Sequence, residues 1–399
     1  MERDQKNQRR RATMKDVARL AGVSIGTVSH VLNSSKGATA STVQAVNAAV
    51  AELDYRPNSL ARSLIARRPG KASDTRPRYP RLVTVGYLSI DYMVSIDRVP
   101  PAGSRVTSNG IEKMLGGPAA NVAAFAAGLG APLDVHVEIV SHVGDDADSD
   151  WALEELAQRG IDASGTVQQR GRRLSRCIVL VDGEGQRTIL NEPLQVPVDL
   201  VSRHLGQEDD VGGASCVHFD GFHLETAAKA HRALREAGHS LSFHSAGLPQ
   251  DRATLAHLDD LMGMFDLMLL SQDAFAEMAK DDSGLQARPE SILDRSDDPV
   301  CRAVILTRGS AGALLLRPGM PPFEVPAPET DVVDATGAGD ALAGIFLGSW
   351  LSRGDPEAAL IHAVHGASLS LGALGAQGLL PRAGDIDSTL AAEMLESQT

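Results

Sequence analysis

The spacing of apolar residues changes near position 82. Between residues 13 and 66 apolar side chains recur every three or four positions, which predicts short amphipathic helices. Beyond Leu82, short apolar runs alternate with longer stretches of helical spacing, a pattern that predicts an α/β domain with a mainly parallel sheet. The expected strands are 82–88, 177–181, 217–219, 267–270 and 304–306, and the expected helices are 119–129, 151–159, 226–237 and 340–352.

The N-terminal pattern predicts a helix-turn-helix. Thr13 and Ser24 are suited to begin helices, because their hydroxyl groups can accept a hydrogen bond from the first helical turn. Gly22 supplies the turn between the first helix and a second one over residues 25–32. A third helix that begins at Ser41 completes the expected all-α head.

Charge is divided between the two parts of the chain. The 399 residues carry a net charge of −13, but the segment through Arg81 has 16 basic and 6 acidic residues, about +10, which leaves about −23 beyond it. A basic head before an acidic domain is typical of a DNA-binding regulator, and the acidic part is not expected to bind nucleic acid.

The remaining composition indicates a cytoplasmic protein. No apolar run approaches the roughly 20 residues that span a bilayer, so no membrane partner is expected. The three cysteines, Cys177, Cys216 and Cys301, are widely spaced and form no disulfide or metal pattern. The expected organisation is a basic arm (1–12), a head (13–66), a Pro-, Gly- and Arg-rich linker (67–81), an α/β domain (82–390) and a tail (391–399).

Two segments of the head resemble the lactose-repressor/purine-repressor (LacI) family. Residues 14–33 resemble its helix-turn-helix, and residues 54–64 resemble its hinge helix. The resemblance implies a homodimer on a double-stranded DNA operator, associated with the bacterial nucleoid when bound. The second helices would enter successive major grooves, and Leu64 would be the wedge that kinks the minor groove.

The same resemblance assigns the DNA contacts. The base-reading positions fall on Ile25, Gly26 and His30. Gly26 has no side chain with which to read a base, whereas Ile25 can contact a thymine methyl group and His30 can hydrogen-bond to a base edge. A head that packs but no longer binds DNA is the alternative. The residues expected to contact phosphates are Lys15, Ser24, Thr27, Ser29 and Asn33.

The motif most specific for chemistry is Val333-Asp-Ala-Thr-Gly-Ala-Gly-Asp-Ala341, directly before an apolar helix. The backbone N–H groups of Gly337, Ala338 and Gly339 are expected to converge at the helix N-terminus and form an anion hole for a transferring phosphoryl group. Asp340 at its edge is placed to accept the proton of an attacking hydroxyl. The alternative is a tight turn with an acid at the helix start.

A second glycine-rich element precedes an alanine-rich helix at residues 116–130. Gly116 and Gly117 allow a ligand to approach the backbone closely, and Asn121 is expected to face that ligand. Plain helix packing is the alternative.

Together the two motifs resemble the ribokinase (PfkB) family of carbohydrate kinases, over residues 82–387. The resemblance implies a three-layer α/β domain with a small β lid, and phosphorylation of a sugar-like alcohol by ATP with Mg²⁺. A lid hairpin is expected within residues 172–190. The positions that match the family are Asp340 as base, residues 337–339 as anion hole, Asp91, Gly116, Gly117 and Asn121 at the sugar, Thr307, Gly309, Gly312 and Gly375 at ATP, and Asp334 at a monovalent cation such as K⁺.

Several positions depart from that family. The stretch 271–274 lacks the asparagine and glutamate that serve hydrated Mg²⁺, and Asp273 is a possible substitute. Ser89 and Ser149 replace an asparagine and a glycine. The histidines show no metal-ligand spacing, although His244 follows an apolar strand and could line the cleft. The lid arginines, which could meet an anionic substrate or form a solvated basic face, are Arg170, Arg172, Arg173, Arg176 and Arg187.

The sequence therefore predicts a DNA-binding regulator whose effector domain is an ATP-dependent sugar kinase. Two alternatives remain open. The kinase fold could act only as a sugar or nucleotide sensor for the head, or the protein could be a plain sugar kinase with a vestigial head.

Overall fold

The computed structural model describes residues 14–23, 27, 40–52, 80–183, 187–205, 215–248, 255–279, 293 and 300–396. Contacts between residues divide the chain into two units, Met1–Asp74 and Thr75–Thr399. The structure determines each unit by itself.

In the first unit, helix α1 (Met14–Ala21) packs against helix α3 (Ala40–Glu52). Their contact is a small core of Val17, Ala18, Val46 and Ala49. The predicted first and third helices are thus confirmed. The predicted second helix and the hinge lie outside the described residues except for Thr27, which is helical.

The second unit is built on an eight-stranded sheet of order β14-β13-β12-β11-β10-β9-β1-β4. The six strands from β4 to β12 run parallel, and the last two are antiparallel, so the expectation of a mainly parallel sheet is confirmed. The strand bounds are β1 (Arg81–Val85), β4 (His136–Val140), β9 (Ser215–Phe219), β10 (Ser240–His244), β11 (Leu267–Ser271), β12 (Ala303–Thr307), β13 (Ala313–Leu316) and β14 (Phe323–Val325).

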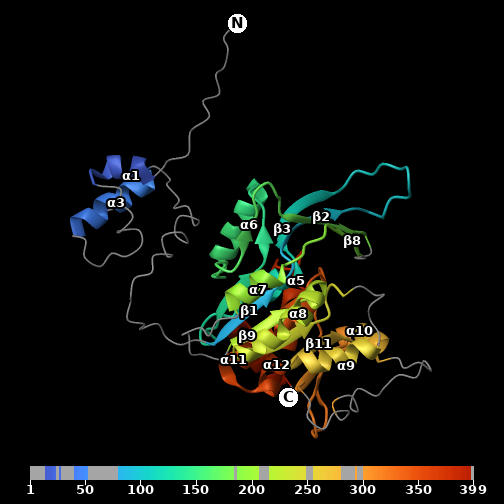
Figure 1. Ribbon diagram of the computed structural model, residues 1–399. Helices are drawn as coiled ribbons and strands as arrows, with labels where there is room; N and C mark the ends of the chain where they lie inside the picture. Colours follow the sequence, from blue (N-terminus) through green and yellow to red (C-terminus); the bar gives the residue numbers. More distant parts are fainter. Residues whose placement is uncertain are drawn as a thin grey trace. The chain divides into compact units, whose positions relative to one another are not determined.

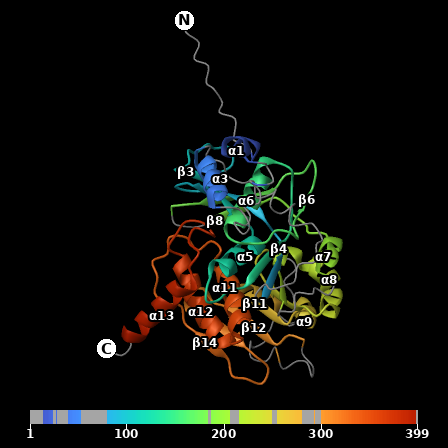
Figure 2. The same cartoon turned by 90° about the vertical axis from the view of Figure 1, so that its left-hand side faces the viewer.

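Helices cover both faces of this sheet, as Figure 2 shows with the strands between two helical layers. Successive side chains of a strand point to opposite faces, so Leu267 and Leu269 pack into one core while Met268 and Leu270 pack into the other. Burial on both faces explains the continuous apolar runs. One layer holds α5 (Pro118–Gly128), α11 (Ala338–Arg353), α12 (Pro356–Ser370) and α13 (Ala383–Glu396), and the other holds α7 (Val198–Leu205), α8 (Leu224–Glu236), α9 (Leu255–Met264) and α10 (Gln272–Met278).

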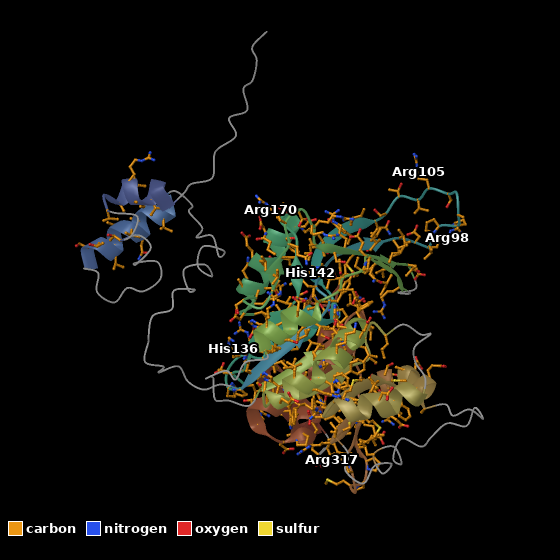
Figure 3. All side chains as sticks on the ribbon, viewed as in Figure 1. Arg98, Arg105, His136, His142, Arg170 and Arg317 are labelled. Atoms are coloured by element: carbon orange, nitrogen blue, oxygen red, sulfur yellow. The ribbon has the colours of Figure 1, made fainter. Side chains whose placement is uncertain are left out.

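A second, four-stranded sheet of order β3-β2-β7-β8 forms the small β lid (Figure 1). Strands β7 (Ser175–Val181) and β8 (Arg187–Asn191) are antiparallel, which confirms the predicted lid hairpin. Strand β2 (Ser89–Ser95) pairs with β7 and with β3 (Gly110–Gly116). Figure 3 shows Arg98 and Arg105 on the long loop between β2 and β3, at the outer end of the lid. Helix α6 (Ala147–Gln158) and the short strands β5 (His142–Val143) and β6 (Val167–Gln168) lie beside it.

The expected strand 82–88 is divided between the two sheets. Strand β1 ends at Val85, and the chain enters the lid at Ser89. The break occurs because the Tyr87 backbone N–H donates to the Asp220 carboxylate at 2.6 Å instead of to a neighbouring strand. The first residue of β1 is Arg81, which the sequence placed in the linker. Its guanidinium is buried against Glu138 of β4 at 2.6 Å.

Candidate active site

Asp340 lies in the first turn of α11, as the motif predicted. Gly337 precedes the helix with φ of 74°, a left-handed conformation that favours glycine. It also packs closely, because a Cβ atom at this position would lie 2.6 Å from the Ala376 Cβ. The Asp340 side chain is buried at the positive end of the helix, where a negative charge is favoured.

Two side chains from other elements hold the Asp340 carboxylate. Asn121 of α5 donates from Nδ2 to Oδ2 at 2.8 Å, and His244 at the end of β10 lies with Nε2 3.1 Å from Oδ1. Gln377 in turn donates to the Asn121 Oδ1 at 2.8 Å, and its own Oε1 is buried without a protein partner. Asn121 thus faces Asp340, in accord with its expected position at the site.

Asp91 lies close to Asp340 and is also buried. Burial is the main cause that raises the pKa of Asp91 from 3.8 to about 6; the hydrogen bond from Ser89 opposes this rise, and the negative charge of Asp340 adds to it. The Ser89 hydroxyl donates to Asp91 Oδ1 at 2.7 Å. The serine that departs from the family pattern therefore orients the acid expected at the sugar.

A cavity of about 570 Å³ borders the residues expected to form the anion hole. Two of those residues, Ala338 and Gly339, line it. It brings them together with Thr307, Gly309 and Gly312, the positions expected to bind ATP, which lie more than 25 residues earlier in the chain. Apolar residues such as Leu342 and Val364 form much of its wall, which suits a flat aromatic group.

Asp334 connects the loop before α11 to the loop that contains Gly375. Its Oδ1 accepts from the Thr336 backbone N–H at 2.8 Å and from the Thr336 hydroxyl at 2.6 Å, and its Oδ2 accepts from Gly375 N–H at 2.8 Å. The carboxylate therefore braces two loops, and a monovalent cation at Asp334 stays a prediction. Gly375 lies beside this carboxylate, whereas the described cavity wall does not include it.

The other departures have local structural roles. Ser271 caps α10 by accepting from Ala274 N–H at 3.1 Å, and Asp273 lies exposed in the first turn of that helix. Ser149 donates to Asp146 and accepts from Gly144 N–H at 2.8 Å. Among the described residues, no cluster of three or more His, Cys, Asp or Glu side chains could hold a metal ion.

The lid arginines have separate environments. Arg173 pairs with Glu192, and Arg176 pairs with Asp148 at 2.8 Å. Arg187 of β8 instead reaches the loop before α11, where Nη1 donates to Thr336 Oγ1 at 3.0 Å. Arg170 and Arg172 are exposed, and Figure 3 shows Arg170 at the edge of the domain. One of the five arginines therefore contacts the site.

The sequence missed a row of polar side chains beneath Asp340. His218 lies on β9 next to Ser242 and His244 on β10, and all three are buried. The available signal was the alternation of polar with apolar residues in Ser215-Cys-Val-His-Phe219 and Ser240-Leu-Ser-Phe-His244, two strands that the pattern otherwise buries on both faces. The two histidines contact each other, a pairing that metal-ligand spacing in the sequence does not reveal.

Comparisons with known proteins agree with this geometry. Residues 80–383 match the pfkB family of carbohydrate kinases, and residues 13–58 match the lacI family of bacterial regulatory proteins. No helix among the described residues has the length and apolar character needed to cross a membrane.

Relatives divide between the two parts of the chain. An ATP-dependent ribose-1-phosphate kinase of Halopiger xanaduensis is 29% identical over 301 residues, which cover 74% of this chain and 94% of the relative. The ribose operon repressor of Escherichia coli is 58% identical over 53 residues, 13% of this chain. The chain spans only 16% of that repressor's length, so the likeness is confined to the head.

Solved structures show the fold of the larger unit. The ribokinase of Thermotoga maritima superposes with a TM-score of 0.64 at 21% identity, covering 78% of this chain and 99% of its own. The ribokinase of Arabidopsis thaliana, complexed with ribose and ATP, superposes with a TM-score of 0.61 and covers 78% and 98% of the two chains. The three-layer fold with a β lid is thus confirmed. By the match over residues 80–383, the chain belongs to the pfkB family of carbohydrate kinases, here fused to a lacI-family helix-turn-helix head.

Proposed function

We propose that this protein is a transcriptional regulator that phosphorylates the sugar it senses. The observation that carries the kinase proposal is the position of Asp340. Its buried carboxylate is held at a helix N-terminus by Asn121 and His244, and a cavity of nucleotide size begins at the adjacent Gly339.

In the proposed reaction, Asp340 accepts the proton of a sugar hydroxyl as that oxygen bonds to the γ-phosphorus of ATP and ADP leaves. The backbone N–H groups of residues 337–339 stabilise the charge on the transferring group. Asp91, Gly116, Gly117 and Asn121 hold the sugar. Thr307, Gly309, Gly312 and Gly375 serve the nucleotide.

The described residues fit ATP better than they fit a protein-bound metal. Mg²⁺ would enter with the phosphates and neutralise their charge when bound. Asp273 is exposed and Ser271 caps α10, so these described residues offer Mg²⁺ no cluster of ligands. This observation favours the second candidate, a kinase fold with weak turnover that serves as a sugar and nucleotide sensor.

The substrate we propose is a ribose-type sugar. Both halves of the chain support this class, since the kinase relative is named for ribose 1-phosphate and the repressor relative for the ribose operon. Ribose and ribose 1-phosphate are therefore the first compounds to test, followed by other pentoses, hexoses and nucleosides.

We further propose that a homodimer in the bacterial cytoplasm binds an operator through the head. Lys15, Ser24, Thr27, Ser29 and Asn33 would contact phosphates, Ile25 and His30 bases, and Leu64 the minor groove. For the sugar to regulate binding, it must favour one arrangement of the dimer over another by a few kcal/mol.

ADP release by the purified full chain tests the kinase proposal, with Asp340→Ala as control. Turnover on one sugar that the variant loses would support it. If no sugar is turned over but sugar or ATP stabilises the protein thermally, the domain is a sensor instead of a kinase. Operator affinity measured with and without that sugar then tests regulation, and identical affinities would refute it.

A further inference from the structure

A row of four polar side chains crosses the centre of the main sheet beneath Asp340. Cys216 and His218 alternate on β9, and Ser242 and His244 alternate on β10, so all four lie on the face that α5 and α11 cover. All four are buried, and His218 and Ser242 are fully buried. A buried polar row of this kind is costly unless every group is hydrogen-bonded.

The row forms a continuous chain of contacts that ends on Asp340. Cys216 Sγ lies 3.2 Å from Ser242 Oγ, which lies 2.8 Å from His218 Nδ1. His218 Nε2 lies 2.9 Å from His244 Nδ1, and the two rings stack with centroids 4.8 Å apart. His244 Nε2 then reaches Asp340 Oδ1 at 3.1 Å.

The groups at the two ends of this hydrogen-bonded row decide which member of each pair donates. A carboxylate only accepts, so His244 donates from Nε2 to Asp340, and a neutral His244 ring then accepts at Nδ1. His218 then donates from Nε2 and accepts at Nδ1 from the Ser242 hydroxyl. Ser242 finally accepts from the Cys216 thiol. With both rings neutral, only this arrangement satisfies every atom.

Burial keeps the far end of the chain uncharged. Burial, and secondarily the neighbouring His244, hold the pKa of His218 well below its ordinary value. Burial raises the pKa of the Cys216 thiol to about 11, so the thiol keeps its proton near neutral pH and remains a donor. The negative charge of Asp266 also raises the pKa of the Cys216 thiol.

We propose that His244 is a positioning residue for the Asp340 carboxylate, held in its donor form by His218, Ser242 and Cys216. The proposal rests on the proposed role of Asp340 as the base. His244 and Asn121 each donate to a different carboxylate oxygen, which prevents the group from rotating about its bond to Cβ. The remaining lone pairs stay in a fixed direction for the sugar hydroxyl.

Two substitutions at His244 test this role. In His244→Gln, the amide nitrogen replaces the ring Nε2 as donor, and we expect kcat within about fivefold of the wild type. In His244→Leu, the donor is lost, and we expect kcat to fall about 10- to 100-fold with KM for sugar and ATP changed less than about threefold. Equal loss of kcat in both variants would overturn the positioning role.

His239→Leu is the matched control. His239 is also buried beside β10, but its Nε2 contacts the Leu205 carbonyl oxygen and its ring lies outside the chain to Asp340. We expect this variant to lose stability without loss of kcat per folded molecule. A purely structural role for His244 would give the same result in His244→Leu, with lower folded yield and an unchanged kcat.

A spectroscopic measurement separates this inference from the kinase proposal. Nitrogen-15 spectra of the full chain with labelled histidine report which ring nitrogen carries the proton. We expect Nε2–H on both His218 and His244, and a shifted His244 Nε2 signal in Asp340→Ala. Nδ1–H on His218, or a doubly protonated His244, would contradict the proposed direction of the hydrogen bonds. If the wild type turns over no sugar, the kinase proposal fails, and these spectra still decide whether His244 holds Asp340.

Discussion

Gly116 provides the space that the Asp91 carboxyl group occupies. A Cβ atom on Gly116 would lie 2.1 Å from Asp91 Cγ, well inside any tolerated contact. Gly116 of β3 pairs with Ser89 of β2, and Asp91 lies two positions further along β2. Gly116 was expected to let a ligand approach the backbone. In the structure it makes room for Asp91, the residue proposed to bind that ligand.

We predict that Gly116→Ala lowers sugar affinity at least tenfold, because Asp91 must move from its hydrogen bond with Ser89. Gly110→Ala, at the other end of β3, is the control, since a Cβ atom there meets nothing within 4 Å. Calorimetric titration of the sugar into each variant checks this. Equal affinities in the two variants would show that Asp91 does not hold the sugar.

Asp91→Asn is predicted to stabilise the ligand-free protein at pH 8. The raised pKa means that folding favours protonated Asp91, so this contribution to stability is full below about 3.8 and is lost as pH rises through about 6. The difference corresponds to about 3 kcal/mol, and the amide avoids it. Thermal unfolding should show a higher Tm for the variant at pH 8 and a smaller difference at pH 5. A pH-independent difference would contradict the prediction.

The ionised form of Asp91 should bind the sugar more tightly, because a carboxylate accepts hydrogen bonds from two hydroxyl groups. Wild-type affinity is therefore expected to rise as pH increases through about 6. Titrations between pH 5 and pH 8 measure this. A flat profile, or a rise that persists in Asp91→Asn, would assign the dependence to another group.

Two glycines of the proposed anion hole are predicted to separate folding from nucleotide binding. Gly337→Ala should lower Tm, because the position has a left-handed φ and abuts Ala376. Gly339→Ala should leave Tm unchanged or slightly higher, since its Cβ atom meets nothing within 4 Å. The new methyl group would project beside the cavity that Gly339 lines, so KM for ATP should rise at least tenfold. An unchanged KM in Gly339→Ala would place the nucleotide elsewhere.

Arg187→Ala is predicted to reduce kcat/KM about tenfold. The guanidinium links the lid to Thr336 beside the proposed anion hole, so its loss removes a contact between the lid and the loop before α11. Arg173→Ala is the control, because Arg173 pairs with Glu192 on the lid itself. Steady-state kinetics on both variants check the prediction, and equal effects would indicate a general loss of lid charge.

The sequence predicted the elements that local patterns determine. Glycine spacing placed Asp340 correctly at the first turn of α11, and apolar runs placed four of the five expected strands to within two residues. It did not predict the break after Val85, which depends on Asp220 more than 130 residues later. The sequence also did not predict the contact between His244 and Asp340. That contact depends on long-range structure, namely the pairing of β9 with β10 and the packing of α11.

The entry of the chain into the kinase domain has a mechanical consequence. Strand β1 begins at Arg81, anchored by Glu138, and runs between two parallel neighbours toward Gly86 and Tyr87. A pull along the linker would load the hydrogen bonds of β1 in shear, so that they resist together instead of opening one by one. The strand is therefore a stiff element of roughly 17 Å between the start of the second unit and Gly86.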